Sequence, residues 1–195
     1  MANINHKPSK YMLNLLHVLP SVVEGKEDVI NVIVENLQGT INKYEIITES
    51  GQLKLDRVGY SSLAFPFTYG ALPQTWDYDG DPLDVEIVNV TEPLVPGCLV
   101  EARVIGVMKF EDGGEVDDKI IAVLADDRRS DHIQSIADFG EQFTKETTYF
   151  WERYKDLKKP GSGIPKGFFD KNEALKVIKE CTARYDEEYA PKLEK

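Results

Sequence analysis

The spacing of the apolar residues changes partway along this chain, and the change predicts two kinds of secondary structure. Up to about residue 130, apolar residues occur in short runs rich in Val and Ile, which are typical of β-strands. These runs cover residues 29–35, 84–90, 98–108 and 119–124. Two further runs, at residues 43–48 and 53–58, flank a turn at residues 49–52 and predict a β-hairpin. Short strands at such regular intervals favour a small β-barrel, in which Gly113 and Gly114 turn the last pair of strands.

After residue 130 the apolar residues recur with a period close to 3.6, which predicts amphipathic helices. The first helical face consists of Phe143, Thr147, Phe150, Trp151 and Tyr154, and the second of Leu175, Ile178, Thr182, Tyr185 and Tyr189. The sequence Pro-Gly-Ser-Gly at residues 160–163 separates the two helices, and Asp170 or Asn172 can cap the second. This order of elements predicts an α+β protein that is mainly β, a barrel with C-terminal helices packed on it. Because no repeat or linker interrupts the pattern, we expect residues 1–195 to form a single domain.

The composition is ordinary for a globular protein, but the charge is strongly negative. Hydrophobic residues make up 42% of the 195 residues and charged residues 29%, which is enough to build one full core. The net charge of -11 argues against nucleic acid as a partner, because binding to phosphates needs a basic surface. An anionic substrate could bind only where metals and a local group of Lys and Arg make the electrostatic potential of the site positive.

Neither the N-terminal region nor the cysteines indicate export or a membrane anchor. The apolar residues of 11–23 are interrupted by Asn14 and His17, and no small-residue cleavage site follows them. No apolar run approaches the ~20 residues of a membrane span. Cys98 and Cys181 lie far apart and match no metal-ligand spacing, so we expect reduced thiols and a cytoplasmic protein.

Two short acidic clusters give the strongest indication of chemistry. The first is Asp79-Gly80-Asp81-Pro82-Leu83-Asp84, and the second is Asp112-Gly113-Gly114-Glu115-Val116-Asp117-Asp118-Lys119. If the fold brings both into one cleft, so many like charges cannot all stay ionised without compensation. The usual compensation for clustered oxygen ligands is a divalent cation such as Mg²⁺, Mn²⁺ or Ca²⁺. Taken one at a time, each cluster could instead be a solvated acidic turn.

An EF-hand does not explain the first cluster. With Asp77 at position one, position six holds Pro82 instead of glycine, and position twelve holds Val88 instead of glutamate. Pro82 also stiffens the loop, and Trp76 and Tyr78 place bulky groups beside the charges. A stiff acidic loop of this kind suits ligands better than solvent.

Basic side chains occur where they could face these carboxylates. Asp117 and Lys119 are two residues apart on a predicted strand and so point to one face, as do Lys43 and Glu45. A Tyr-Lys pair at residues 154–155, at the end of a predicted helix, can bind a phosphate oxygen. No Walker A sequence and no Gly-x-Ser-x-Gly elbow is present, so phosphate recognition must come from side chains and metals.

Taken together, these motifs resemble the soluble, metal-dependent inorganic pyrophosphatases of the barrel-fold family, in their bacterial type. The resemblance covers roughly residues 30–157, and the Asp-Gly-Asp-Pro-x-Asp signature at residues 79–84 is its most specific part. The downstream order of Asp112, Asp117, Lys119 and Tyr154-Lys155 also matches. The resemblance implies a five-stranded OB-type barrel that hydrolyses pyrophosphate to two orthophosphates with several Mg²⁺ ions. It also implies a homo-oligomer, a hexamer.

The resemblance further assigns a role to each residue of the expected site. Metal ligands are expected at Asp79, Asp84, Asp112 and Asp117, and nearer the edge at Glu35 and Glu45 through water. The substrate-binding set is Lys43, Arg57, Lys119, Tyr154 and Lys155. The catalytic set is Asp81, Tyr69 and Arg57, with Asp81 as the general base.

Three positions depart from the family pattern. Phe65 stands where many relatives have Tyr, Thr68 replaces a common Asn, and residues 160–163 lack a Lys often found after the Tyr-Lys pair. These departures affect fine tuning rather than the reaction class. Two rival functions stay open: a hydrolase of nucleoside di- or triphosphates, and an OB-fold module that binds oligonucleotides. Against the first function, the chain has no sequence that resembles a Nudix glutamate helix. The second function would need a basic groove with stacking aromatic residues, and the chain has acidic loops instead.

Overall fold

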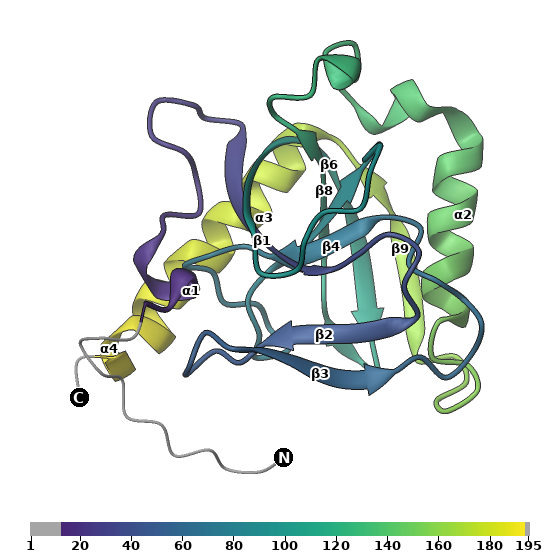
Figure 1. Ribbon diagram of the computed structural model, residues 1–195, viewed down its shortest axis with the longest axis horizontal. Coiled ribbons are helices and arrows are strands. Elements are labelled where there is room, and N and C mark those ends of the chain that lie inside the picture. The colour runs from purple at the N-terminus through teal and green to yellow at the C-terminus, as the bar shows by residue number, and fades with distance from the viewer. Residues whose placement is uncertain (1–12, 194–195) are drawn as a thin grey trace.

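A closed five-stranded β-barrel forms the centre of the computed structural model, which describes residues 13–193 (Figure 1). Its strands, in the order in which they pair, are β1 (Val29–Asn36), β4 (Thr68–Ala71), β5 (Asp84–Val88), β8 (Lys119–Leu124) and β6 (Leu99–Asp112). Strand β6 pairs back with β1 and closes the barrel. Strands β5 and β8 run parallel with Asp84 opposite Lys119, and the other barrel pairs are antiparallel. The expected mainly β fold with a five-stranded barrel is confirmed.

The Val- and Ile-rich runs form strands whose alternate residues contribute to two different cores. In β8, Ile120 and Ala122 pack in a cluster with α3 (Lys171–Arg184). The intervening Ile121 and Val123 pack in an aromatic-rich cluster with α2 (Gly140–Arg153). Such a strand is buried on both faces, so it has a continuous apolar run instead of an alternating pattern. The two predicted helices therefore cover different faces of the barrel (Figure 1).

Strands β4 and β9 were not predicted from the sequence. β9 (Gly163–Phe169) lies between the two helices and pairs with β6, and the short β7 (Glu115–Val116) pairs with the end of the same strand. Pro165 and the glycines of β9 weaken its strand signal, and proline is tolerated at the edge of a sheet. Residues 160–163 separate the two helices as predicted, and β9, which begins at Gly163, adds a strand between them that the sequence did not predict.

The expected hairpin is present, and it forms a separate two-stranded sheet beside the barrel. Strand β2 (Asn42–Ile46) pairs with β3 (Leu53–Val58). The buried carboxylate of Glu35, at the end of β1, accepts a hydrogen bond from the backbone N–H of Ile46 at 2.7 Å. This contact holds the hairpin against the barrel.

The C-terminal part of the chain continues beyond α3 in a π-helix (Tyr185–Tyr189) and α4 (Ala190–Leu193). Asp170 caps α3, because its carboxylate accepts from the backbone N–H of Glu173 at 3.0 Å; the alternative cap, Asn172, lies inside the helix.

Helix α1 (Leu15–Val18) packs against this C-terminal region (Figure 1). The ring of His17 stacks on Tyr185 and Tyr189 at centroid distances of 5.8 and 5.0 Å. Its Nδ1 lies 2.8 Å from the Tyr185 hydroxyl, and its Nε2 lies 2.8 Å from the carbonyl oxygen of Thr48. Within residues 13–193, no helix is both long and apolar enough to span a bilayer. The first two residues of the 11–23 segment lie outside the described residues.

Candidate active site

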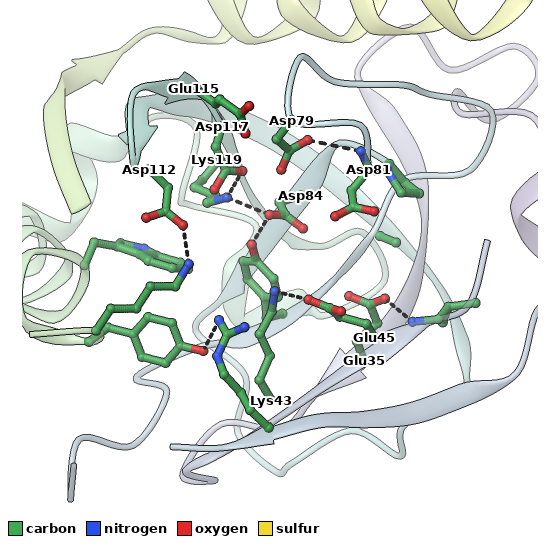
Figure 2. A pocket seen from close by; sticks show the side chains of 18 of the residues that line it. Glu35, Lys43, Glu45, Asp79, Asp81, Asp84, Asp112, Glu115, Asp117 and Lys119 are labelled. Carbon is green, nitrogen blue, oxygen red and sulfur yellow. Dashed lines mark hydrogen bonds and ion pairs between the residues drawn. The ribbon is translucent and has the colours of Figure 1, made fainter. Parts of the chain in front are cut away.

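One end of the barrel carries a pocket of about 400 Å³, bounded by the β2–β3 hairpin, the barrel strand ends and the chain after α2 (Figure 2). All the residues that the sequence predicts for the site line this pocket: Glu35, Lys43, Glu45, Arg57, Tyr69, Asp79, Asp81, Asp84, Asp112, Asp117, Lys119, Tyr154 and Lys155. The structure thus brings both acidic clusters and the basic residues together. In total, eight acidic and five basic side chains line the pocket.

The first acidic cluster forms a tight turn that presents Asp79 and Asp81 to the pocket, next to Asp84 at the start of β5 (Figure 2). The backbone N–H of Asp77 donates to the carbonyl of Asp81 at 2.8 Å and closes the turn. Gly80 has a φ of +86°, a conformation that other residues rarely adopt, so the glycine permits the turn. The carboxylate of Asp79 accepts from the backbone N–H of Asp81 at 3.1 Å. The loop is therefore shaped by its own backbone and by one of the carboxylates it presents.

Lys119 lies at the floor of the pocket and joins the two acidic clusters. Its ammonium donates to Asp84 at 2.6 Å and also to Asp117, and only 1% of the side chain is exposed. The same nitrogen lies 5.2 Å from the ring centroid of Trp151 and 5.4 Å from that of Phe110, distances at which a cation is attracted to an aromatic face. The parallel pairing of β5 with β8 sets this arrangement, because it places Asp84 opposite Lys119.

The wall opposite the acidic loop is basic. Arg57 donates from Nη2 to the hydroxyl of Tyr154 at 2.9 Å, and its guanidinium also lies 5.4 Å from that ring. Lys155 donates to Asp112, and Lys43 donates to Glu45. These groups come from β2, β3 and the end of α2, so an anion in the pocket would meet cations from three elements.

The acidic side chains carry more negative charge than the lysines balance. Burial, and then Asp84, raises the pKa of Glu35 to about 8 and that of Asp79 to about 7. The pKa of Asp117 is also raised to about 7, because burial and the nearby carboxylates outweigh Lys119. Burial opposes ionisation of Asp84 as well, but there Lys119 prevails and lowers the pKa. One buried ammonium cannot stabilise every carboxylate that surrounds it.

This donor set fits divalent cations. The eight acidic side chains offer hard oxygen ligands, which Mg²⁺ and Ca²⁺ prefer. The raised pKa values of Asp79 and Asp117 show that the nearby lysine does not fully compensate for burial and for the neighbouring carboxylates. Lysines contact Asp84, Asp117 and Asp112, and among residues 13–193 no three Asp, Glu, His or Cys side chains converge as a ready-made ligand set. Cations entering the pocket would therefore compete with lysines for carboxylate oxygens.

Four residues around the pocket have no role predicted from the sequence. Glu115 and Lys159 line the pocket; Glu115 belongs to the second acidic cluster but has no predicted role of its own, and Lys159 stands in a polar turn with the composition of a solvated loop. Trp151 also lines the pocket, and its indole N–H donates to the fully buried carboxyl of Glu86 at 2.7 Å. Burial raises the pKa of Glu86 to about 8. A charged residue inside the apolar run of β5 was the available signal for this contact.

The three departures from the family pattern lie in different surroundings. Phe65 does not line the pocket; it is buried in the aromatic core, where its ring lies 5.8 Å from Tyr69 and 5.5 Å from Tyr154. The hydroxyl of Thr68 is buried, and it has no hydrogen-bond partner within the described residues. Lys159 at the pocket rim precedes residues 160–163, so this stretch has a nearby cation despite the departure.

Known proteins resemble this chain over most of its length. The sequence profile of the family described as "Inorganic pyrophosphatase" matches residues 32–186. The inorganic pyrophosphatase of Geobacillus stearothermophilus is 43% identical over 161 residues, which are 82% of this chain and 96% of the relative. The inorganic pyrophosphatase of Neisseria meningitidis serogroup A is 45% identical, over 82% of this chain and 90% of the relative.

Solved structures give the same result. The crystal structure of an inorganic pyrophosphatase from Neisseria gonorrhoeae superposes with a TM-score of 0.83 at 40% identity, covering 88% of this chain and 99% of that one. The inorganic pyrophosphatase from Thermus thermophilus superposes with a TM-score of 0.82 at 39% identity, covering 89% and 99%.

Proposed function

The chain belongs to the inorganic pyrophosphatase family and is a hydrolase, and we propose that it hydrolyses inorganic pyrophosphate to two orthophosphates with Mg²⁺ as its cofactor. One observation carries the proposal: clustered carboxylates line one side of the pocket, and Arg, Lys and Tyr side chains face them across it. Pyrophosphate is a small, highly charged anion, and it needs both walls. Cations held by the carboxylates would take up part of its charge, and the basic side chains would bind the rest.

The carboxylates would hold the metal ions. We assign Asp79, Asp84, Asp112 and Asp117 as ligands, and Glu35 and Glu45 as outer residues that act through water. When bound, divalent cations neutralise substrate charge and lower the pKa of water toward about 7.

Asp81 is the proposed general base. Loss of surrounding water, and then Glu45 and Asp84, raise the pKa of Asp81 to about 6. A base with a pKa close to the working pH can accept a proton from water and release it again afterwards. Within the described residues, its carboxylate makes no hydrogen bond or ion pair with another side chain, so it is available for that proton.

The basic wall is proposed to bind the phosphate oxygens. Arg57 and Tyr154 already contact each other, so one phosphate group could accept hydrogen bonds from both. Lys43 and Lys155 would move from their carboxylate partners to the anion, and Lys119 would stabilise charge from the floor. Tyr69 donates its hydroxyl to Asp84 and would orient that ligand.

The pocket does not favour nucleotides or oligonucleotides. The aromatic side chains that line it, Tyr69, Trp151 and Tyr154, are only 1, 5 and 4% exposed. None of these three rings is therefore presented for stacking on a base, which single-strand binding proteins require.

Phosphate release is the direct test. We expect release from pyrophosphate in the presence of Mg²⁺, little release from ATP or tripolyphosphate, and none from any of them in excess chelator. Equal rates on ATP would point to a nucleotide hydrolase, and robust release in chelator would refute the metal dependence.

We further propose a cytoplasmic enzyme whose residues 1–195 form a single domain and assemble as a homohexamer. Light scattering over a dilution series should give about six times the 22.0 kDa chain mass. A mass of one chain at all concentrations would refute the assembly.

A further inference from the structure

We propose that Arg184, at the C-terminal end of α3, is a positioning residue that holds the acidic loop of residues 77–82 in its working geometry. The proposal rests on the proposed function, because Asp79 and Asp81 in this loop are assigned as a metal ligand and the general base. Arg184 itself does not line the pocket. It would act through Asp77 and Tyr78, which immediately precede the first ligand.

Arg184 contacts both of these residues. The central carbon of its guanidinium lies 3.3 Å from the ring centroid of Tyr78, so the planar cation lies flat on the ring. Its Nη1 lies 3.9 Å from a carboxylate oxygen of Asp77. The side chains of Arg184 and Asp77 are only 14% and 4% exposed. The carboxylate of Glu188, one turn further along, lies 3.9 Å from Nε of Arg184.

The same end of α3 holds the backbone that leads into the loop. The carbonyl of Cys181 accepts from the backbone N–H of Trp76 at 3.0 Å, and the Cys181 thiol donates to Asp77 at 3.6 Å. The ring of Trp76 lies 4.6 Å from that of Tyr189 in the π-helix. Three consecutive residues, 76–78, are therefore attached to the C-terminal helical region.

Movement of this segment must reach the site, because Asp77 is part of the turn itself. Its backbone N–H donates to the carbonyl of Asp81 at 2.8 Å, and its carbonyl accepts from Gly80 at 3.3 Å. The carboxylate of Asp79 is in turn fixed by the N–H of Asp81. A shift at Asp77 therefore displaces both proposed functional carboxylates together.

The contact between Arg184 and Asp77 is poorly suited to stabilising the fold alone. One carboxylate oxygen of Asp77 and Nη1 of Arg184 are buried without a hydrogen-bond partner in the described part of the chain. At 3.9 Å the pair is longer than a good charge-assisted hydrogen bond. The close contact is the flat stack on Tyr78, whose ring is otherwise largely exposed at 63%. The arrangement restrains the position of the loop at the expense of ideal pairing.

The test compares Arg184→Gln with Lys179→Gln, which removes an exposed charge from the same helix. Hydrogen exchange in the metal-free protein should become faster in peptides covering residues 77–83 of Arg184→Gln and stay unchanged in the β2–β3 hairpin. Mn²⁺ binding without substrate, followed by the electron paramagnetic resonance signal of the free ion, should weaken by about 3- to 30-fold, the range expected for a partly desolvated cation–π contact. Part of the loss in kcat should be recovered at high Mg²⁺. Lys179→Gln should match the wild type in all these measurements.

Two further variants keep the proposal falsifiable if Arg184→Gln fails to fold. Tyr78→Ala removes only an exposed ring and should also speed exchange in the loop. Arg184→Lys keeps the charge but not the planar stack and should lie between wild type and Arg184→Gln. Wild-type exchange in the loop and wild-type Mn²⁺ affinity in folded Arg184→Gln or Tyr78→Ala would overturn the proposal. A wild-type chain that binds Mn²⁺ but releases no phosphate from pyrophosphate would instead refute the proposed function and leave the loop contact standing.

Discussion

Replacing Asp81 with Asn separates the proposed chemistry of the pocket from its architecture. Asn has the shape of Asp but cannot take a proton from water. Within residues 13–193, the backbone of Asp81 forms the hydrogen bonds of the turn, whereas its carboxylate bonds to no other side chain. The substitution therefore removes a base without breaking a contact.

We expect a large loss of catalysis and no loss of stability. General base catalysis contributes about 10²–10⁴ in rate, so kcat for pyrophosphate should fall by that factor, which corresponds to about 2.7–5.5 kcal/mol in the activation barrier. The free energy of unfolding should not decrease, because the raised pKa of Asp81 shows that its charged form is unfavourable in the folded state, and Asn removes that charge. Initial rates of phosphate release at saturating pyrophosphate, together with urea denaturation, measure the two quantities.

Asp84→Asn is the matched comparison, because the two carboxylates differ in their contacts. Asp84 accepts from Tyr69 and from the ammonium of Lys119, so the substitution weakens an ion pair whose lysine is 1% exposed and whose carboxylate is 19% exposed. Disruption of such a pair costs up to about 3–5 kcal/mol, and here Asp117 remains as a second partner for the lysine. Part of the lost activity should return at high Mg²⁺. Near-normal kcat in Asp81→Asn, or its rescue by Mg²⁺ alone, would refute the assignment of Asp81 as the base.

Three other outcomes are expected. Trp151→Phe should lower the free energy of unfolding, measured by urea denaturation, by about 1–3 kcal/mol, because it leaves the buried carboxyl of Glu86 without its donor. Adding Glu86→Leu should restore part of this loss, and a double variant whose loss equals the sum of the two single losses would contradict the contact. The contribution of His17 to stability should become unfavourable as the pH falls below about 6.5, because burial lowers its pKa in the folded chain and the unfolded chain then binds more protons at this side chain. In urea denaturation the difference in free energy of unfolding between the wild type and His17→Gln should therefore shift in favour of His17→Gln as the pH falls, and a difference that stays constant with pH would contradict this. Lys155→Ala should raise KM and lower kcat in steady-state assays, since phosphate contacts act in both ground and transition states, whereas Lys145→Ala on the exposed face of α2 should change neither.

Local sequence signals predicted the elements whose burial follows a simple pattern. The runs of β-branched residues became β1, β5, β6 and β8, because strands with buried residues on both faces are rich in apolar side chains at successive positions. β9 escaped because Pro165 and two glycines lower its strand propensity, and its pairing with β6 outweighs them. β4 escaped because its four residues are too short for a period to be recognised.

The residues of the candidate site also fall into two groups, those that local sequence spacing identified and those that it could not. The spacing within the Asp-Gly-Asp-Pro-x-Asp signature and the Tyr-Lys pair pointed to residues that the fold collects in one pocket. The contact of Glu86 with Trp151 spans 65 positions, and that of Arg57 with Tyr154 spans 97, so no local spacing encodes them. Lys159 was missed for another reason, since two adjacent lysines before a Pro-Gly turn have the composition of a solvated loop.

The parallel pairing of β5 with β8 has a consequence for how the chain folds. It joins residues 35 positions apart, and a parallel pair cannot form through a tight turn, so the chain between them must be closed as a long loop first. Asp84 meets Lys119 only when this step is complete, and a partly folded chain with an open barrel has no pocket. Ligands of the pocket should then bind the closed barrel alone, which raises the free energy of unfolding with the logarithm of their concentration once that concentration exceeds the dissociation constant. They should slow unfolding more than they speed folding, because their contacts form after the barrier has been crossed.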